Sequence, residues 1–489
     1  KLSREELKQL YLAFDGDTQK AETEEELPVP TPEEPEQVTD STKASDAIPA
    51  ETPKKQRNRV HAMKADDRVE RNVTVSTVPE GERLCSVCGK EMKCFSYAEH
   101  EVFTFVPAKI VVEVEKREKL GCSCRGDAVT AERSSTPSVT RKVDASLLAK
   151  LLTDKCCQGL PLDRQRRELR RLGLEVPEKT LQSYWSYTTD LIEPVALAVL
   201  SGVFASPIVG ADDTHLKTLD KCSKHGVFRG HIWCFVGTDG TLGSPETVAY
   251  GYTPTWEATE IADWFSSIDG FIQVDGYAGY SREVDDDDGE TRVAVPDDRR
   301  LGCGMHIRSK FHAALLAKDR RAAIALKHFA DLYAIEADCK ARNLDAEARL
   351  IERTNQSVPI LNALDEWVDA THPKLLPKSP LRQATTYAIN QREFFRRCFS
   401  DGRFEIDNGR TERHIRPFAV ARRNFLFTGS VRGGERLATA FTLVDNCVLL
   451  GIDPYRYLVD IITKLEANWP LRRLSELTPR NWLAQQATK

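Results

Sequence analysis

Three carboxylates occupy positions from which they could act together in a metal-dependent reaction. Asp212 and Asp275 each end an apolar run that is typical of a buried strand, and Glu412 lies one turn inside a predicted helix. Residues at the carboxyl ends of adjacent strands project into a shared crevice. Hard oxygen ligands suit Mg²⁺ or Mn²⁺, and two such ions about 3.5–4 Å apart clamp the attacking and leaving oxygens of an in-line phosphoryl displacement. The three acids are therefore a candidate two-metal site.

Each acid also has a structural interpretation. Asp212 could simply end a strand, and Asp213 beside it is a rival ligand. Asp275 stands before a glycine and could be a turn residue. Glu412 could form an i,i+4 ion pair with Arg416. The residue types alone leave these alternatives open.

The elements that must position the acids follow from the hydropathy pattern. Residues 207–252 are typical of three strands, residues 255–267 of an amphipathic helix, and residues 270–280 of a further buried strand that ends at Asp275. Residues 301–306 form a short apolar piece that predicts one more strand. This order predicts a mixed sheet of α/β type.

A long helical region, residues 306–404, separates this sheet from the stretch that carries Glu412. Residues 407–408 are Asp-Asn, a good N-cap pair for the helix that follows. If Glu412 is not the third acid, Glu405 and Glu336 are the next candidates.

Closely spaced cysteines predict a separate metal site. Cys85 and Cys88 form a C-x-x-C knuckle, and Cys122 and Cys124 form a C-x-C pair after a predicted β-hairpin. Four thiolates from two tight turns are what a tetrahedral zinc site needs. Cys94 could replace one ligand, and buried free cysteines are the alternative.

The region between the cysteines and the sheet is predicted to be helical. Gly173 ends one helix, and Pro177 fits the first turn of the next. The pair could be a helix-turn-helix that enters a DNA groove, or an amphipathic hairpin that packs on its neighbour. Both interpretations stay open.

Composition and charge limit the class of protein. A length of 489 residues allows about two to four domains, and we find neither an apolar run long enough to span a membrane nor a signal peptide. The first residue is Lys1, so we expect the chain to be part of a longer product. A net charge of −5, from 69 basic and 74 acidic residues, argues against a uniformly basic nucleic-acid binder. The charge is segregated, however, with basic clusters at residues 54–59, 164–171 and 410–436.

From about residue 80 to its end, the chain resembles, in order, transposases of the insertion-sequence-66 family. The stretches that carry the resemblance are residues 212–214, 273–280, 302–306, 332–336, 405–413, 429–436 and 471–482. The resemblance implies a ribonuclease-H-like catalytic domain in which Asp212, Asp275 and Glu412 form the triad. It also implies that the knuckle of Cys85 and Cys88 belongs to the family's zinc-binding domain.

The same resemblance implies a mechanism and partners. The chain would cleave DNA at transposon ends with two Mg²⁺ or Mn²⁺ ions and join the freed 3′-hydroxyl to target DNA, while Zn²⁺ is structural. It would act as a homodimer or higher multimer on DNA, with accessory proteins and no membrane partner, in the bacterial cytoplasm at the nucleoid. The arginines expected to track DNA phosphates are Arg413, Arg416, Arg422, Arg423, Arg432 and Arg436. The rival classes are a transposase-derived DNA-binding protein without catalysis and a ribonuclease-H-fold nuclease.

Together these patterns predict an α+β multidomain chain. Its predicted parts are the end of an N-terminal helical region (1–16), a disordered linker (17–79), a zinc-ribbon-like β unit (80–130), a helical DNA-binding region (140–195), a ribonuclease-H-like mixed-sheet α/β catalytic domain (196–305 and 405–430), an all-helical insertion (306–404) and C-terminal helices (431–489).

Overall fold

The computed structural model describes residues 110–111, 119–121, 128–130 and 143–487, except residues 221–225, 242 and 286–290. The predicted zinc ligands lie outside the described residues, as do the predicted linker and the N-terminal helix. These ligands are Cys85, Cys88, Cys122 and Cys124, with Cys94 as the alternative. Of the predicted β unit, the structure describes one antiparallel pair, β1 (Lys119–Gly121) with β2 (Ala128–Thr130).

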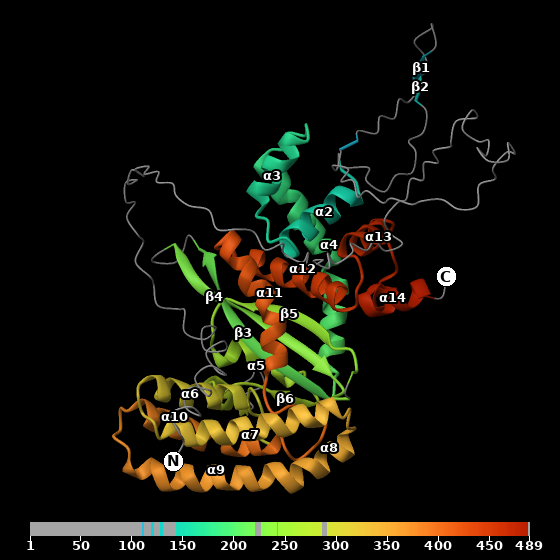
Figure 1. The fold of residues 1–489 in the computed structure, drawn as a ribbon. Helices are drawn as coiled ribbons and strands as arrows, with labels where there is room; N and C mark the ends of the chain where they lie inside the picture. Colours follow the sequence, from blue (N-terminus) through green and yellow to red (C-terminus); the bar gives the residue numbers. More distant parts are fainter. Residues whose placement is uncertain are drawn as a thin grey trace, which may run out of the picture. The chain divides into compact units, whose positions relative to one another are not determined.

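A five-stranded mixed sheet organises the described part of the chain, in the order β5–β4–β3–β6–β9 (Figure 1). The strands are β3 (Ile208–Leu219), β4 (Val227–Thr238), β5 (Thr247–Thr253), β6 (Phe271–Gln273) and β9 (Arg300–Leu301). The first three pair antiparallel, whereas β6 joins β3 in parallel and β9 joins β6 in parallel. The predicted mixed sheet is confirmed.

The last strand is shorter than the sequence suggested. β9 ends at Leu301, and His306 belongs to helix α6 (Gly304–Leu316). The strand ends here because the backbone turns to other partners. The N–H of Gly302 donates to the carbonyl of Phe394, and the N–H of Gly304 donates to the carbonyl of Ile406.

One face of the sheet is covered by helix α5 (Ala258–Ser266). Alternation along β4 points Trp233 and Phe235 to this face, where both rings pack on Phe265. The apolar side of α5 also buries Ile261. A small hairpin of β7 (Glu283–Asp285) and β8 (Thr291–Val293) follows β6 along the chain.

The opposite face is covered by helices α4 (Glu178–Phe204), α11 (Gly409–Phe425) and α12 (Val431–Leu449). Residues of the other parity on β4, such as Ile232 and Cys234, belong to this second core. Because the two faces of β4 bury different cores, the register of the strand is strongly specified.

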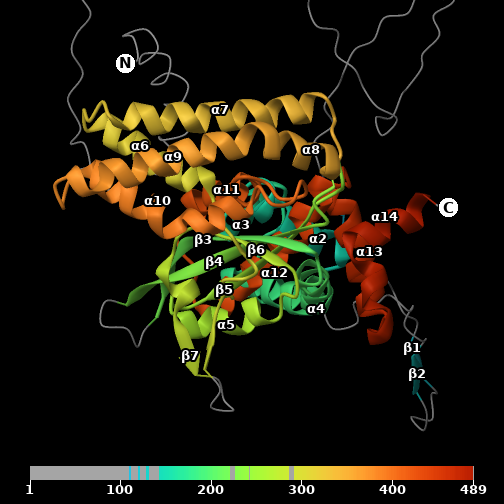
Figure 2. The ribbon, with the colours of Figure 1, turned by 90° about the horizontal axis from the view of Figure 1, so that it is seen from below.

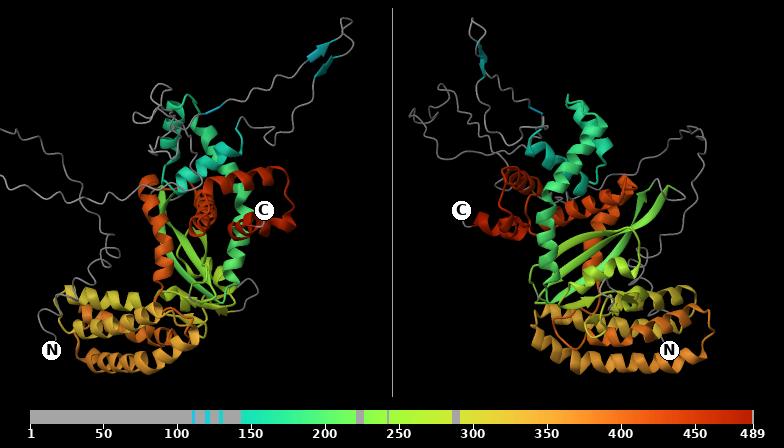
Figure 3. Two further views of the ribbon diagram at one scale, coloured as in Figure 1. Left: turned by 45° about the vertical axis from the view of Figure 1, so that its right-hand side comes forward. Right: turned by 180° about the vertical axis from the view of Figure 1, so that it is seen from behind.

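Helix α4 differs from the expectation that no segment of the chain is long and apolar enough to span a membrane. Among the described residues it is the one helix long and apolar enough to cross a membrane by length and composition. It packs on β4, β5 and α12 (Figure 3). Its side chains Ile192, Val195 and Val199 are buried in the core. These contacts are those of a core helix of the sheet.

A bundle of helices connects β9 to α11 (Figure 2). After α6 it contains α7 (Ala322–Ala341), α8 (Ala346–Glu352), α9 (Val358–Thr371) and α10 (Pro380–Arg397), with a π-helical turn at Arg353–Ser357. Its core includes Phe311, Phe329 and Phe395, which are buried against one another. The expected helical segment between the sheet and Glu412 is present.

Two further helices precede α4, namely α2 (Ala145–Cys156) and α3 (Leu162–Arg171). Gly173 follows α3 with φ of +91°, a conformation that glycine adopts without strain, and Pro177 stands at the N-cap of α4. The predicted succession of helix, glycine turn and helix is present, and its role in DNA binding stays a prediction. The chain ends with α13 (Pro454–Glu466), a 3-10 turn (Leu471–Leu477) and α14 (Pro479–Ala487).

Candidate active site

The parallel pairing of β3 with β6 places two of the candidate acids. Gly210 lies opposite Gln273 in this pairing, and Asp212 and Asp275 each stand two residues further along their strand's direction. Alternation within β3 places Asp212 on the face of Gly210, and Asp275, two residues past the end of β6, is near enough to raise the pKa of Asp212. The two carboxylates are thus neighbours on one side of the sheet.

Helix α11 brings Glu412 to this same face. The Asn408 amide donates to the Ala211 carbonyl (2.9 Å) and accepts from the Thr411 hydroxyl (2.6 Å). A Cβ atom on Gly210 would lie 2.3 Å from the Thr411 hydroxyl oxygen, so only glycine allows this approach of helix to strand. Glu412, which follows Thr411, therefore enters the site from the first turn of α11.

Asn408 occupies the predicted N-cap position but does not cap the helix with its side chain. Its amide is used to attach α11 to β3, as the two hydrogen bonds above show. The cap residue is thus a docking residue, which the sequence pattern alone did not distinguish.

The acids lie close enough to influence one another's charge. Burial raises the pKa of Asp212 well above its usual value, and His306 opposes this increase. The carboxylates of Asp275 and Glu412 raise the pKa of Asp212 further. Crowded carboxylates in a half-buried site favour a divalent cation, because its charge relieves their repulsion. The donor set of oxygens fits Mg²⁺ or Mn²⁺.

Asp213, the rival ligand, points to the other face of the sheet. Its carboxylate lies 2.6 Å from Nδ1 of His231, which comes from β4. The His231 ring stacks on Trp256 (5.4 Å between ring centres), and Trp256 stacks on Tyr277 (4.3 Å). The Asp213 carboxylate is therefore paired with His231, whereas Asp212 lies on the face that receives Glu412.

The alternative third acids are held by basic side chains. Glu336 is buried and accepts from Arg349 (2.5 Å) and Arg353 (2.7 Å). Glu405 pairs with Lys340 (3.0 Å). Burial tends to raise the pKa of Glu405, but Arg349 and Lys340 outweigh it and lower this pKa to about 2. Both acids stabilise the connection between the helical bundle and α11.

His306 and Cys303 are site residues to which the sequence analysis gave no role. Cys303 is the N-cap residue of α6, and His306 is the third residue of this helix. Ligand atoms of Cys303, His306 and Glu412 all lie within 4.8 Å of one another. Burial raises the pKa of the Cys303 thiol well above its usual value. A cysteine and a histidine three residues apart are the available signal in the sequence, but the apolar pattern of residues 301–306 predicts a strand there.

The six arginines expected to contact DNA fall into two groups. Arg413, Arg416 and Arg423 lie exposed on α11. Arg422 is half-buried and donates to the Thr214 hydroxyl (2.6 Å) and to the His215 carbonyl, so it attaches α11 to β3.

Arg432 and Arg436, at the start of α12, bind acids of α4. Arg432 lies 2.7 Å from Glu193 and 2.9 Å from Asp190, and Arg436 lies 2.7 Å from Asp190. These ion pairs connect two helices that pack on the sheet, and they compete with any contact to phosphate.

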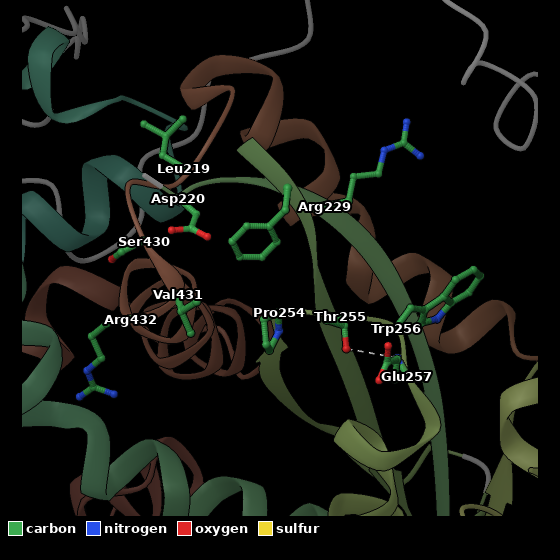
Figure 4. Close-up of a pocket in the computed structure, with 11 residues that line it drawn as sticks. Leu219, Asp220, Arg229, Pro254, Thr255, Trp256, Glu257, Ser430, Val431 and Arg432 are labelled. Carbon is green, nitrogen blue, oxygen red and sulfur yellow. Dashed lines mark hydrogen bonds between the residues drawn. The ribbon is translucent and has the colours of Figure 1, made fainter. Parts of the chain in front are cut away.

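An open groove of about 860 Å³ lies between the start of α12 and the ends of β3 and β4 (Figure 4). Leu219, Pro254 and Val431 line it, with Trp256 at its edge. None of the three candidate acids lines this groove. The candidate chemistry therefore lies on the sheet face beneath α11.

A mixed sheet that carries acids beneath a helix with exposed arginines is suited to a nucleic-acid substrate, and comparison with known proteins agrees. The family model described as "Transposase IS66 family" matches residues 141–436, which is more than half of the chain and includes all three acids. The fold and this match define a member of a transposase family, a class of proteins that bind and process DNA. It belongs to the IS66 family.

Relatives occur in Sinorhizobium fredii (strain NBRC 101917 / NGR234). The uncharacterized protein y4qI is 29% identical over 414 residues, which cover 83% of this chain and 75% of the relative. The uncharacterized protein y4hP is 29% identical over 436 residues, which cover 85% of this chain and 76% of the relative. Neither name assigns a substrate or a catalytic residue.

Proposed function

We propose that this transposase cleaves phosphodiester bonds at the ends of its element and joins the freed 3′ end to target DNA. Asp212, Asp275 and Glu412 would form the catalytic site for both steps. The observation that carries the proposal is the gathering of these acids on one sheet face. One comes from β3, one follows the end of the adjacent parallel strand β6, and the third comes from a helix attached to β3. This arrangement favours a two-metal site over three unrelated surface acids.

The order of the strands supports the choice of fold class. Three antiparallel strands are followed by two strands parallel to the first, in the order β5–β4–β3–β6–β9. We propose that this sheet is a ribonuclease-H-like domain, into which the helices from α6 to α10 are inserted before α11.

Each acid has a distinct task in the proposed reaction. Asp212 and Asp275 would hold divalent cations from the sheet, and Glu412 would complete the site from α11. Bound Mg²⁺ or Mn²⁺ would lower the pKa of a nucleophilic water and stabilise charge on the leaving oxygen. The protein's contribution is to fix the carboxylates, through the contact of Asn408 with Ala211 and the close approach at Gly210.

Exposed arginines next to the acids would hold the DNA strand. Arg413, Arg416 and Arg423 project from the helix that carries Glu412 and can bind phosphates without reading sequence. We propose that these three contact DNA, and that Arg422, Arg432 and Arg436 hold helices in place. A multimer that pairs two ends fits this function.

Strand transfer is the test that separates a transposase from a nuclease of the same fold class. A duplex that carries the element's end with a free 3′-hydroxyl is incubated with supercoiled plasmid and Mg²⁺ or Mn²⁺. We expect the protein to join the end to the plasmid, and we expect Asp275→Asn to bind the duplex without joining it. Hydrolysis of the plasmid or of an RNA strand, with no joined product, would contradict the proposal.

We also propose that Cys85, Cys88, Cys122 and Cys124 bind one structural Zn²⁺, as four closely spaced thiols can. The zinc content of the purified protein tests this directly. One zinc per chain, lost in Cys85→Ser, is the expected result. A zinc content that the substitution leaves unchanged would contradict it.

A further inference from the structure

The start of α6 is held firmly against the segment that leads into α11. The Gly304 N–H donates to the Ile406 carbonyl (2.9 Å), and a Cβ atom at Gly304 would lie 2.8 Å from that same oxygen. The Asn408 N–H donates to the sulfur of Cys303 (3.2 Å). These contacts fix the position of His306, one turn into α6, relative to Glu412.

The imidazole of His306 faces the acids but lacks a hydrogen-bond partner for one nitrogen. Its Nδ1 is buried and accepts or donates no hydrogen bond among the described residues. Oε1 of Glu412 lies 3.9 Å from this nitrogen, which is too long for a hydrogen bond. A buried polar atom without a partner calls for an unseen water or ion.

The separation of these two atoms fits two ligands of one ion. At metal–ligand distances of about 2.1–2.2 Å, octahedral geometry places neighbouring ligands about 3 Å apart and opposite ligands about 4.3 Å apart. The 3.9 Å between Nδ1 and Oε1 is shorter than the separation of opposite ligands, so one ion can reach both atoms after a small adjustment of either side chain. Asp212 is also close, since His306 opposes the increase in its pKa.

We propose that His306 supplies a nitrogen ligand to the metal position held by Glu412 and Asp212, and that this position consequently prefers Mn²⁺ to Mg²⁺. The inference rests on the proposed function, because it adds a ligand to the same two-metal site. An imidazole nitrogen suits transition ions, whereas Mg²⁺ selects oxygen ligands. A site of three carboxylates alone would lack this preference.

Cys303 is close to the same position but serves a different purpose. Its sulfur accepts the Asn408 N–H, and the residue caps α6. Thiolates select soft ions, and neither Mn²⁺ nor Mg²⁺ is soft. We therefore assign Cys303 to positioning.

Electron spin-echo spectroscopy of bound Mn²⁺ detects a coordinated nitrogen without relying on catalysis. The untagged full chain is loaded with Mn²⁺ alone and compared with His306→Gln. A second comparison uses His231→Gln, a histidine on the opposite sheet face that binds Asp213. We expect ¹⁴N modulation in the parent protein and in His231→Gln, and its loss in His306→Gln. The Mn²⁺ affinity of His306→Gln should fall about 10-fold, while its Mg²⁺ affinity changes less.

Labelling the histidines with ¹⁵N in the parent protein should replace the ¹⁴N modulation, and this measurement needs no variant to fold. Bound Mn²⁺ without nitrogen modulation, or modulation that survives His306→Gln, overturns the inference about His306. If Glu412→Gln and Asp212→Asn also leave Mn²⁺ binding unchanged, the metal site of the proposed function fails as well. The two failures are therefore distinguishable.

Discussion

Asp212, inside β3, and Asp275, just past the end of the parallel strand β6, each stand two residues beyond the direct pairing of Gly210 with Gln273. The relationship explains how acids 63 positions apart in the sequence, from 275 − 212, reach one site. It also identifies which face of the sheet must receive the third acid, and α11 packs on that face. The predictions below follow from this arrangement.

The close approach of α11 to β3 depends on Gly210. We expect Gly210→Ala to destabilise the protein by about 1–3 kcal/mol and to reduce DNA cleavage, because the new methyl collides with Thr411 and Asn408. Gly202→Ala is the matched control, since nothing lies within 4 Å of its added methyl and alanine favours the helix. Urea denaturation measures both. Equal stability of the two variants would show that the contact between α11 and β3 leaves room for a methyl group at residue 210.

The buried carboxylate of Glu336 holds two arginines of the helical bundle. Glu336→Gln should lower the free energy of unfolding by about 3–5 kcal/mol, because it removes the carboxylate that pairs with the buried Arg353 and leaves Arg349 with Glu405 at 3.4 Å. Asp338→Asn, which removes an exposed pair with Arg342, should cost at most about 1 kcal/mol. The denaturation midpoints of the two variants measure this difference in stability. Similar losses of stability in both would contradict a specific role for the buried ion pairs of Glu336.

Asp445 makes the stability depend on pH. Burial raises the pKa of Asp445 to about 6, although the Tyr250 hydroxyl donates to its carboxylate. A carboxyl whose pKa is higher in the folded state binds more protons there, so its contribution to stability falls as pH rises from about 4 to about 6. Relative to Asp445→Asn, the parent protein should therefore lose about 2 kcal/mol across this window. A stability difference that stays constant from pH 4 to pH 7 would rule this out.

The two groups of arginines should respond differently to salt. Arg416→Ala and Arg423→Ala should each lower the slope of log binding constant against log salt concentration by about 1, because each removes one phosphate contact. Arg436→Ala should leave the slope unchanged and reduce stability, since it breaks the pair with Asp190. DNA-binding titrations at several salt concentrations provide the comparison. A reduced slope in Arg436→Ala would place this residue on the DNA instead.

The sequence predicted the elements of the sheet well because buried strands have a strong apolar signal. Asp212 and Asp275 could be proposed since each ends an apolar run, but the prediction that Asp212 ends its strand is wrong, because β3 continues past it to Leu219. The choice between Asp212 and Asp213 was out of reach, because alternation assigns them to opposite faces without saying which face receives α11. The contact of Asn408 with Ala211 supplies that information.

Other features depend on contacts between distant segments. The partners of Arg432 and Arg436 lie on α4, more than 200 positions earlier, so the basic cluster looked like a free surface. His306 was missed for a local reason, namely that the apolar residues before it favoured a longer strand. Hydropathy does not reveal that the backbone of Gly302 bonds to α10 instead of to another strand.

The most direct test of the triad is cleavage of DNA that carries the element's own ends, with Mg²⁺ or Mn²⁺, by the parent protein, Glu412→Gln and Asp213→Asn. Glutamine keeps the shape of Glu412 but removes a carboxylate ligand, whereas Asp213 faces His231 on the other side of the sheet. We predict a loss of about 100-fold or more for Glu412→Gln, with DNA binding retained, and a much smaller change for Asp213→Asn. Cleavage by Glu412→Gln at the parental rate, or a greater loss in Asp213→Asn, would contradict the assignment of the site.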